Sequence, residues 1–139
     1  MKIGKAVLAD IFSHAREEAP RECCGLLIGS GDAVTRTARA ANTDPAPARY
    51  LIDPGDHFNA IRSARAEGLD VIGAYHSHVM SPAIPSAADI AEAHGGPDFL
   101  YLIVSLVDED VRAYRFEDGR TIEVPVRNRR ARGSARSAS

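Results

Sequence analysis

The apolar run FLYLIVSLV, residues 99–107, is the stretch that most constrains what this chain can fold into. A short continuous apolar run bounded by turn signals is typical of a fully buried strand, and it is far shorter than the ~20 residues of a membrane span. We therefore predict that it forms the central strand of a sheet. Further buried strands are predicted at residues 70–78 (DVIGAYHSH) and 24–29 (CGLLIG), with residues 33–42 as the hairpin partner of the latter.

Apolar side chains at helical spacing lie between these strands. They predict helices at residues 6–18 and 54–68, the second with Phe58 on its inward face, and a short third helix at 86–94. RYLID, residues 49–53, is predicted as a further short strand. The expected fold class is therefore α/β (α+β), with a single mixed sheet of six or seven strands flanked by two or three helices.

The 139 residues are predicted to form one domain at residues 1–126, followed by a basic tail at residues 127–139. The tail has five Arg, no acidic residue and few apolar residues, so it is predicted to be disordered. Without this tail the chain is more acidic than its net charge of −2 indicates. That balance argues against a nucleic-acid partner for the domain.

Charged residues interrupt the N-terminus too early for the apolar core of a signal peptide, so we expect a cytoplasmic protein with no membrane partner. The two cysteines, Cys23 and Cys24, are neighbours in the chain. Their Cα atoms are ~3.8 Å apart, which is below the usual ~4.4 Å minimum for a disulfide. Both are therefore expected to pack in the buried strand as free thiols.

Two histidines, His76 and His78, end the strand predicted at residues 70–78. Residues two apart in a strand face the same side, so both imidazoles can converge on one cation. After seven intervening residues come Ser86 and Asp89, which share one face if their segment is helical. Two His and one carboxylate leave a coordination position open, an arrangement typical of catalytic rather than structural zinc sites.

Spacing alone leaves other interpretations open. Ser86 and Asp89 directly before the apolar Ile90 also fit a helix capping box, and a polar strand end needs no metal. The other histidines have no partner at ligand spacing and are expected in surface or capping roles: His14, His57 and His94. The spacing of the residues therefore does not decide between a metal site and a helix cap.

The pattern His-x-His, seven residues, Ser-x-x-Asp, preceded by PRECCGLLIG at residues 20–29, resembles the signature of the JAMM (MPN-plus) zinc metalloprotease family. The resemblance covers most of residues 1–126 and implies the cytidine-deaminase-like architecture of that family. One position departs from it, because Val79 stands where the family usually has Pro. Val79 is not a ligand position, so the departure concerns the choice of substrate more than the metal site.

Carried over residue by residue, the resemblance implies that His76, His78 and Asp89 bind one Zn²⁺ per chain. It implies that Glu22 takes a proton from the attacking water, and that Ser86 donates a hydrogen bond to the oxyanion. General chemistry agrees with these roles. A carboxylate within reach can take a proton and later give it to a leaving amine, and an oxyanion donor contributes about 3–4 kcal/mol.

The chain is therefore expected to be a zinc-dependent metallopeptidase that hydrolyses an amide or isopeptide bond. The resemblance to small stand-alone family members indicates a ubiquitin-like or sulfur-carrier protein as substrate, cleaved after a Gly-Gly end. The alternatives are a catalytically silent MPN-type protein-binding scaffold and a metal-binding regulatory domain without turnover. The scaffold is disfavoured because all five signature positions are retained. The oligomeric state is left open.

Overall fold

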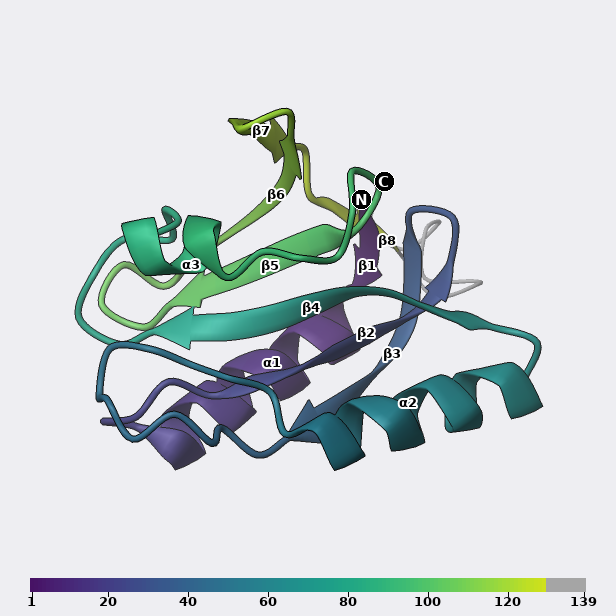
Figure 1. Ribbon diagram of the computed structural model, residues 1–139, viewed down its shortest axis with the longest axis horizontal. Helices are drawn as coiled ribbons and strands as arrows, with labels where there is room; N and C mark the ends of the chain where they lie inside the picture. Colours follow the sequence, from purple (N-terminus) through teal and green to yellow (C-terminus); the bar gives the residue numbers. More distant parts are fainter. Residues whose placement is uncertain (130–139) are drawn as a thin grey trace, which may run out of the picture.

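The apolar runs and helical segments assemble into one mixed sheet of eight strands with three helices, as the computed structural model of residues 1–129 shows (Figure 1). In chain order the elements are β1 (Lys2–Gly4), α1 (Lys5–Glu18), β2 (Cys24–Ser30), β3 (Ala33–Ala40), α2 (Pro54–Ala66), β4 (Asp70–His78), α3 (Ala87–Ala91), β5 (Leu100–Ser105), β6 (Asp110–Glu117), β7 (Arg120–Val124) and β8 (Arg127–Arg129). The predicted fold class and all three predicted helices are confirmed.

The strands follow the order β7-β6-β5-β4-β2-β3-β1-β8 across the sheet. β4 and β5 are parallel, β1 is parallel to both β3 and β8, and the other neighbours are antiparallel. The count exceeds the expected six or seven because of the two three-residue strands, β1 and β8, which pair with each other. β8 uses the first three residues assigned to the tail, and residues 130–139 of that predicted tail lie outside the described residues.

The helices cover the two faces of the sheet. Successive residues of a strand point to opposite faces, so Leu27 packs with Ile11 of α1 on one face, while Leu26 packs with Ala64 of α2 on the other. The strand predicted at 99–107 is β5, an interior strand that is fully buried. Between residues 1 and 129, no helix is long and apolar enough to cross a membrane.

The predicted inward position of Phe58 is wrong. Its side chain is 60 % exposed, and the Arg62 guanidinium lies over its ring, 5.8 Å from the centroid. The buried stripe of α2 instead runs through Ala60 and Ala64. Phe58 is two residues before Ala60, which places it on the opposite side of a helix with 3.6 residues per turn.

The strand predicted at residues 49–53 is also absent from the described structure. Among the described residues, the only β-bridge in this segment is an isolated one between Ile52 and Asn42. The segment lies between the prolines of DPAPA and Pro54, and proline cannot donate to a strand ladder. These residues therefore form a loop, which is held in place by side chains near the functional site.

Two predictions about polar residues have opposite outcomes. Cys23 and Cys24 are buried free thiols, as expected. His14, for which a surface or capping role was expected, is instead 5 % exposed, and its Nδ1 lies 2.8 Å from the Tyr75 hydroxyl. A buried polar pair therefore joins α1 to β4.

Candidate metal centre

His76 and His78 lie at the end of β4, in the interior of the sheet. β4 is paired with β2 on one side and with β5 on the other, so its backbone is held along both edges. His76 stands between Cys24 of β2 and Ile103 of β5. The two imidazoles are buried and share the face that α2 covers, as their spacing predicted.

The two imidazoles and the Asp89 carboxylate converge. His76 Nε2 lies 3.2 Å from His78 Nε2, and Asp89 Oδ2 lies 3.1 Å from the first nitrogen and 3.0 Å from the second. Ligand atoms about 2.0–2.1 Å from a tetrahedral zinc ion would be about 3.3 Å from one another. The three atoms therefore have the spacing that such an ion requires, and all three residues are buried.

The surroundings of the histidines also fit a metal. His78 Nδ1 donates a hydrogen bond to the Pro82 carbonyl at 2.7 Å, which leaves the lone pair of a neutral imidazole on Nε2, the atom that faces the group. Burial lowers the pKa of His76 and so favours its neutral, ligating form. For His78, hydrogen bonds with Asp89 and Pro82 outweigh burial and raise the pKa.

Asp89 reaches the histidines from the first turn of α3. The Ser86 Oγ accepts a hydrogen bond from the Asp89 amide at 3.0 Å, and Asp89 Oδ2 accepts one from the Ser86 amide at 2.9 Å. Burial alone would raise the pKa of Asp89, but hydrogen bonds with His76 and His78 outweigh it and hold that pKa well below its usual range. The capping box is present, and it coexists with the convergence on the histidines.

Glu22 lies two residues before β2 and is only 6 % exposed. The Cys23 amide donates to the Ser77 Oγ at 2.8 Å, and the Ser77 amide donates to the Cys23 carbonyl at 3.2 Å, which fixes this segment against β4. Glu22 Oε1 is buried and has no hydrogen-bond partner among residues 1–129. Burial raises the pKa of the Glu22 carboxyl to about 7, with His78 opposing the rise and Asp89 adding to it.

Tyr50 belongs to the site, although no pattern in the sequence singles it out. Its ring stacks on the His76 imidazole, with centroids 4.2 Å apart and planes 19° from parallel. Stacking at this distance limits rotation of the imidazole. The residue comes from the loop at 41–53, whose path no spacing motif predicted.

Asn42 holds that loop next to Glu22. Its Nδ2 donates to the carbonyls of Glu22 and Arg49, each at 3.0 Å. Its Oδ1 accepts from two backbone amides, also at 3.0 Å each, those of Asp44 and Leu51. One side chain therefore uses both N–H groups and the oxygen to fix the Glu22 segment and the loop of Tyr50 relative to each other.

Comparison with known proteins agrees with this geometry. Residues 4–117 match the family described as prokaryotic homologs of the JAB domain. A protein of Haloferax volcanii named desampylase is 40 % identical over an alignment of 102 residues, and the match covers 68 % of this chain and 73 % of that protein. A Mycobacterium tuberculosis protein named CysO-cysteine peptidase is 34 % identical over 84 % of this chain and 82 % of its own length.

A solved structure shares the fold over almost the whole chain. The solution structure of a Desulfitobacterium hafniense protein superposes with a TM-score of 0.86 at 29 % identity, covering 94 % of this chain and 93 % of that one. The resemblance found in the sequence is confirmed by these matches. The chain, with its strand-end histidines and its helix-borne aspartate, belongs to the family of prokaryotic JAB-domain proteins.

Proposed function

We propose that this protein is a zinc-dependent metallopeptidase that hydrolyses an amide or isopeptide bond at the C-terminal end of a ubiquitin-like or sulfur-carrier protein. The observation that carries the proposal is the convergence of His76, His78 and Asp89 near the buried carboxylate of Glu22. The names of the relatives, a desampylase and a CysO-cysteine peptidase, support the substrate class. A ubiquitin-like or sulfur-carrier protein is thus the proposed partner.

His76 Nε2, His78 Nε2 and Asp89 Oδ2 would hold the metal, because their spacing and burial fit a tetrahedral ion. When bound, zinc supplies Lewis-acid polarisation of the substrate carbonyl and of the attacking water. Three protein ligands leave a fourth position for these groups. The Tyr50 ring against His76 keeps the imidazole oriented.

Glu22 is proposed as the general base and acid. One of its oxygens takes a proton from the attacking water as the water oxygen bonds to the carbonyl carbon. The same carboxyl gives that proton to the leaving nitrogen as the carbon–nitrogen bond breaks. Its Oε1 has no competing partner within residues 1–129, which leaves it available for this transfer.

Ser86 is proposed as the oxyanion donor. A serine hydroxyl has one donor and two acceptor lone pairs. Its oxygen accepts from the Asp89 amide, so the hydroxyl hydrogen stays available to the developing oxyanion. Ser86 is only half-buried, which allows it to meet a substrate.

A cytoplasmic location is part of the proposal. Cys23 and Cys24 are buried as free thiols, which supports a reducing compartment. A catalytically silent scaffold is the weaker alternative, since such a protein needs neither the converged ligand atoms nor a buried acid beside them.

The test is cleavage of conjugates of ubiquitin-like and sulfur-carrier proteins, read by mass spectrometry with and without chelator. Protein purified without added zinc is assayed for metal content. Glu22→Gln is expected to keep the metal and lose about 10²- to 10⁴-fold in rate. Glu18→Gln, which makes the same change at an exposed acid four residues earlier, serves as the control.

The metallopeptidase proposal fails if the protein holds no stoichiometric metal, or if Glu22→Gln cleaves as fast as the unchanged protein. Binding of a conjugate without cleavage, under conditions where metal is retained, would favour the scaffold.

A further inference from the structure

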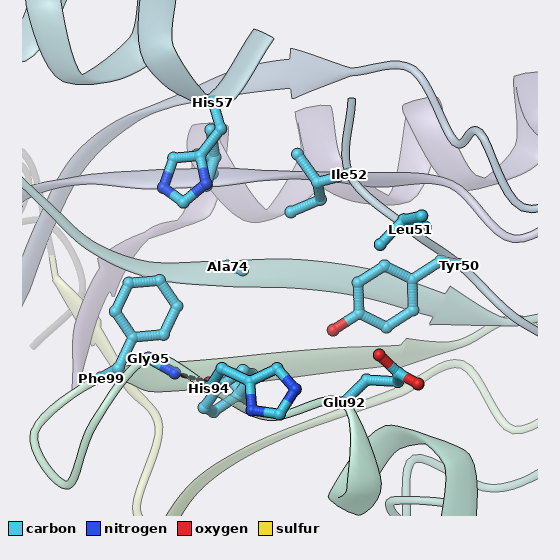
Figure 2. A pocket seen from close by; sticks show the side chains of 11 residues that line it. Tyr50, Leu51, Ile52, His57, Ala74, Glu92, His94, Gly95 and Phe99 are labelled. Atoms are coloured by element: carbon cyan, nitrogen blue, oxygen red, sulfur yellow. Dashed lines mark hydrogen bonds between the residues drawn. The ribbon is translucent and has the colours of Figure 1, made fainter. Parts of the chain in front are cut away.

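A cavity of about 280 Å³ lies beside His76, His78 and Asp89, the proposed metal group, between β4, the start of α2 and the segment that leads into β5. Figure 2 shows Ala74 on β4 between Tyr50 and Phe99, with Ile52 and His57 on one side and Glu92 and His94 on the other. The proposed chemistry does not use this space. Its position next to the site raises the question of what fills it.

The floor of the cavity is one row of the sheet. Ala74 pairs with Leu26 of β2 and with Tyr101 of β5, and all three line the cavity. Ala74 is two residues before His76, so both side chains face the same side of β4. The row with Ala74 is therefore the next step along the sheet from the row with His76. Because the alanine side chain ends at its Cβ, it leaves an empty space above the sheet at Ala74, and this space is the hollow of the cavity.

The cavity adjoins the metal group at Tyr50. That ring stacks on His76 and also lines the cavity, so one side chain forms the boundary between the two. At the far end, Phe99 packs edge-on against Tyr101, with centroids 5.2 Å apart. A group in the cavity therefore lies next to a substrate bond held at the histidines.

The lining favours an apolar occupant. The Tyr101 hydroxyl already accepts a hydrogen bond from the Gly95 amide at 2.9 Å. Glu92, an exposed residue of the lining, lies 3.7 Å from the Arg49 guanidinium. Within residues 1–129, the buried side-chain atoms without a partner are Glu22 Oε1 and His76 Nδ1, and neither residue lines the cavity. Among the described residues, the fully buried groups of the lining therefore present no unpaired polar atom that a polar ligand would have to satisfy.

We infer that the cavity is a specificity pocket for one large aliphatic or aromatic side chain of the substrate's C-terminal tail, about two residues before the residue whose carbonyl is attacked. The inference rests on the proposed function. Two residues of strand, from His76 to Ala74, span about 6.8 Å, and two residues of an extended substrate span the same distance. The volume, just below the about 300 Å³ at which small-molecule sites begin, suits one side chain rather than a cofactor.

The occupant comes from the tail rather than from the leaving group. In the proposed reaction the leaving group is either a single amino acid or a lysine of another protein. A single amino acid does not extend two residues beyond the bond. The C-terminal tail is the part that all these substrates share. A pocket formed by the sheet can therefore contribute to binding of every substrate only if it binds the tail.

The experiment uses two peptide series that end in Gly-Gly, joined to lysine through an isopeptide bond. They differ only in residue X, which is Ala, Leu, Phe or Asp, placed two or three residues before the terminal glycine. Binding of labelled peptides to the metal-free protein is measured by fluorescence anisotropy, and cleavage by the zinc-loaded protein gives kcat/KM. In one of the two series, Leu and Phe are expected to bind and react at least about tenfold better than Asp.

Ala74→Leu fills the hollow and is expected to abolish the preference at X, and Ala74→Val is the smaller change if the first does not fold. Phe99→Ala lengthens the cavity and is expected to shift the preference from Leu toward Phe. Phe58→Ala removes an exposed aromatic from α2, next to His57 but outside the cavity lining, and is expected to keep the preference of the unchanged protein. Thermal unfolding and metal content confirm that each variant is folded.

The two hypotheses fail separately. Cleavage with equal rates for every X in both series, or a preference that persists in folded Ala74→Leu and Ala74→Val, overturns the pocket and leaves the peptidase intact. Binding with the expected preference but no cleavage by the zinc-loaded protein supports the pocket and overturns the peptidase.

Discussion

Ser86 serves the helix and the proposed chemistry with different atoms of one hydroxyl. Its oxygen accepts from the Asp89 amide as the N-cap of α3, while its hydrogen is the proposed oxyanion donor. Substitutions can separate the two functions because helix caps differ in their cost. Replacing a serine cap by alanine costs about 1 kcal/mol, whereas replacing it by glycine costs only a few tenths.

We therefore expect Ser86→Gly and Ser86→Ala to lose the same factor in kcat, about 10²- to 10³-fold, since both lack the hydroxyl. Only Ser86→Ala is expected to lose about 1 kcal/mol in the free energy of unfolding. Steady-state kinetics and urea titrations of the two variants give the comparison. A Ser86→Gly protein that is as active as the parent would show that the residue acts as a cap alone.

At the scale of residues, the sequence predicted the convergence of His76, His78 and Asp89 well and the surroundings of these side chains poorly. The spacing of His76 and His78 fixes a shared face because strand side chains alternate. Tyr50 and Asn42 were missed because they lie in an irregular loop, and their contacts with His76 and Glu22 depend on how that loop crosses the sheet. The course of this loop across the sheet cannot be predicted from any periodicity in the sequence.

The contact between α1 and β4 includes a buried polar pair, His14 and Tyr75. The Tyr75 ring also lies against Gly25 of β2, where a Cβ would meet it at 2.3 Å, so the ring has a fixed place between helix and sheet. Burial lowers the pKa of His14, and Arg39 adds to the effect. The acidic residues that oppose it are Asp10, Glu17 and Glu18.

This pair predicts a pH dependence of stability. The folded-state pKa of His14 lies below the ordinary value of 6.5, so the unfolded chain binds the proton more readily. The part of the free energy of unfolding that depends on neutral His14 is therefore fully present above about pH 6.5 and is lost as the pH decreases toward the folded pKa. His14→Gln, which keeps a hydrogen-bonding group, is expected to remove this part of the decrease.

Urea unfolding of the metal-free proteins between pH 7.5 and 5 tests the prediction, because the other histidines are common to both and cancel in the difference. The parent should lose more stability than His14→Gln below pH 6.5. Two parallel curves would mean that His14 takes up its proton equally well in the folded and unfolded states.

Elements were predicted where local pattern and tertiary packing agree. The helix at 6–18 and the strand at 70–78 each present one clear periodicity, and both form as expected. The short strands β1 and β8 were missed because three residues are too few to show a periodicity. These strands form through tertiary pairing: β1 pairs with β8 and also with β3. The inward position predicted for Phe58 was wrong because an aromatic residue at helical spacing can face solvent when smaller residues, here Ala60 and Ala64, form the buried stripe.

At the scale of the whole molecule, the converging side chains of His76, His78 and Asp89 join parts that are far apart in the chain. His76 and His78 end an interior strand, and Asp89 is held by a five-residue helix that is too short to be stable alone. The unfolded chain does not bring these three side chains together. An ion that binds them therefore binds the folded state and stabilises it.

We expect zinc at a free concentration of 100 times its Kd to raise the free energy of unfolding by about 2.7 kcal/mol, or by about 5–11 °C in Tm for a chain of this size. Chelator should reverse the shift. Asp89→Asn removes one ligand and should abolish most of the shift, whereas Asp98→Asn makes the same change at an exposed position and should retain it. Calorimetric scans of the three proteins with zinc and with chelator measure the effect. Because Asp89 closes the group from α3 while the histidines lie on β4, an unchanged shift in Asp89→Asn would show that the ion binds elsewhere and that the strand and helix are not joined through it.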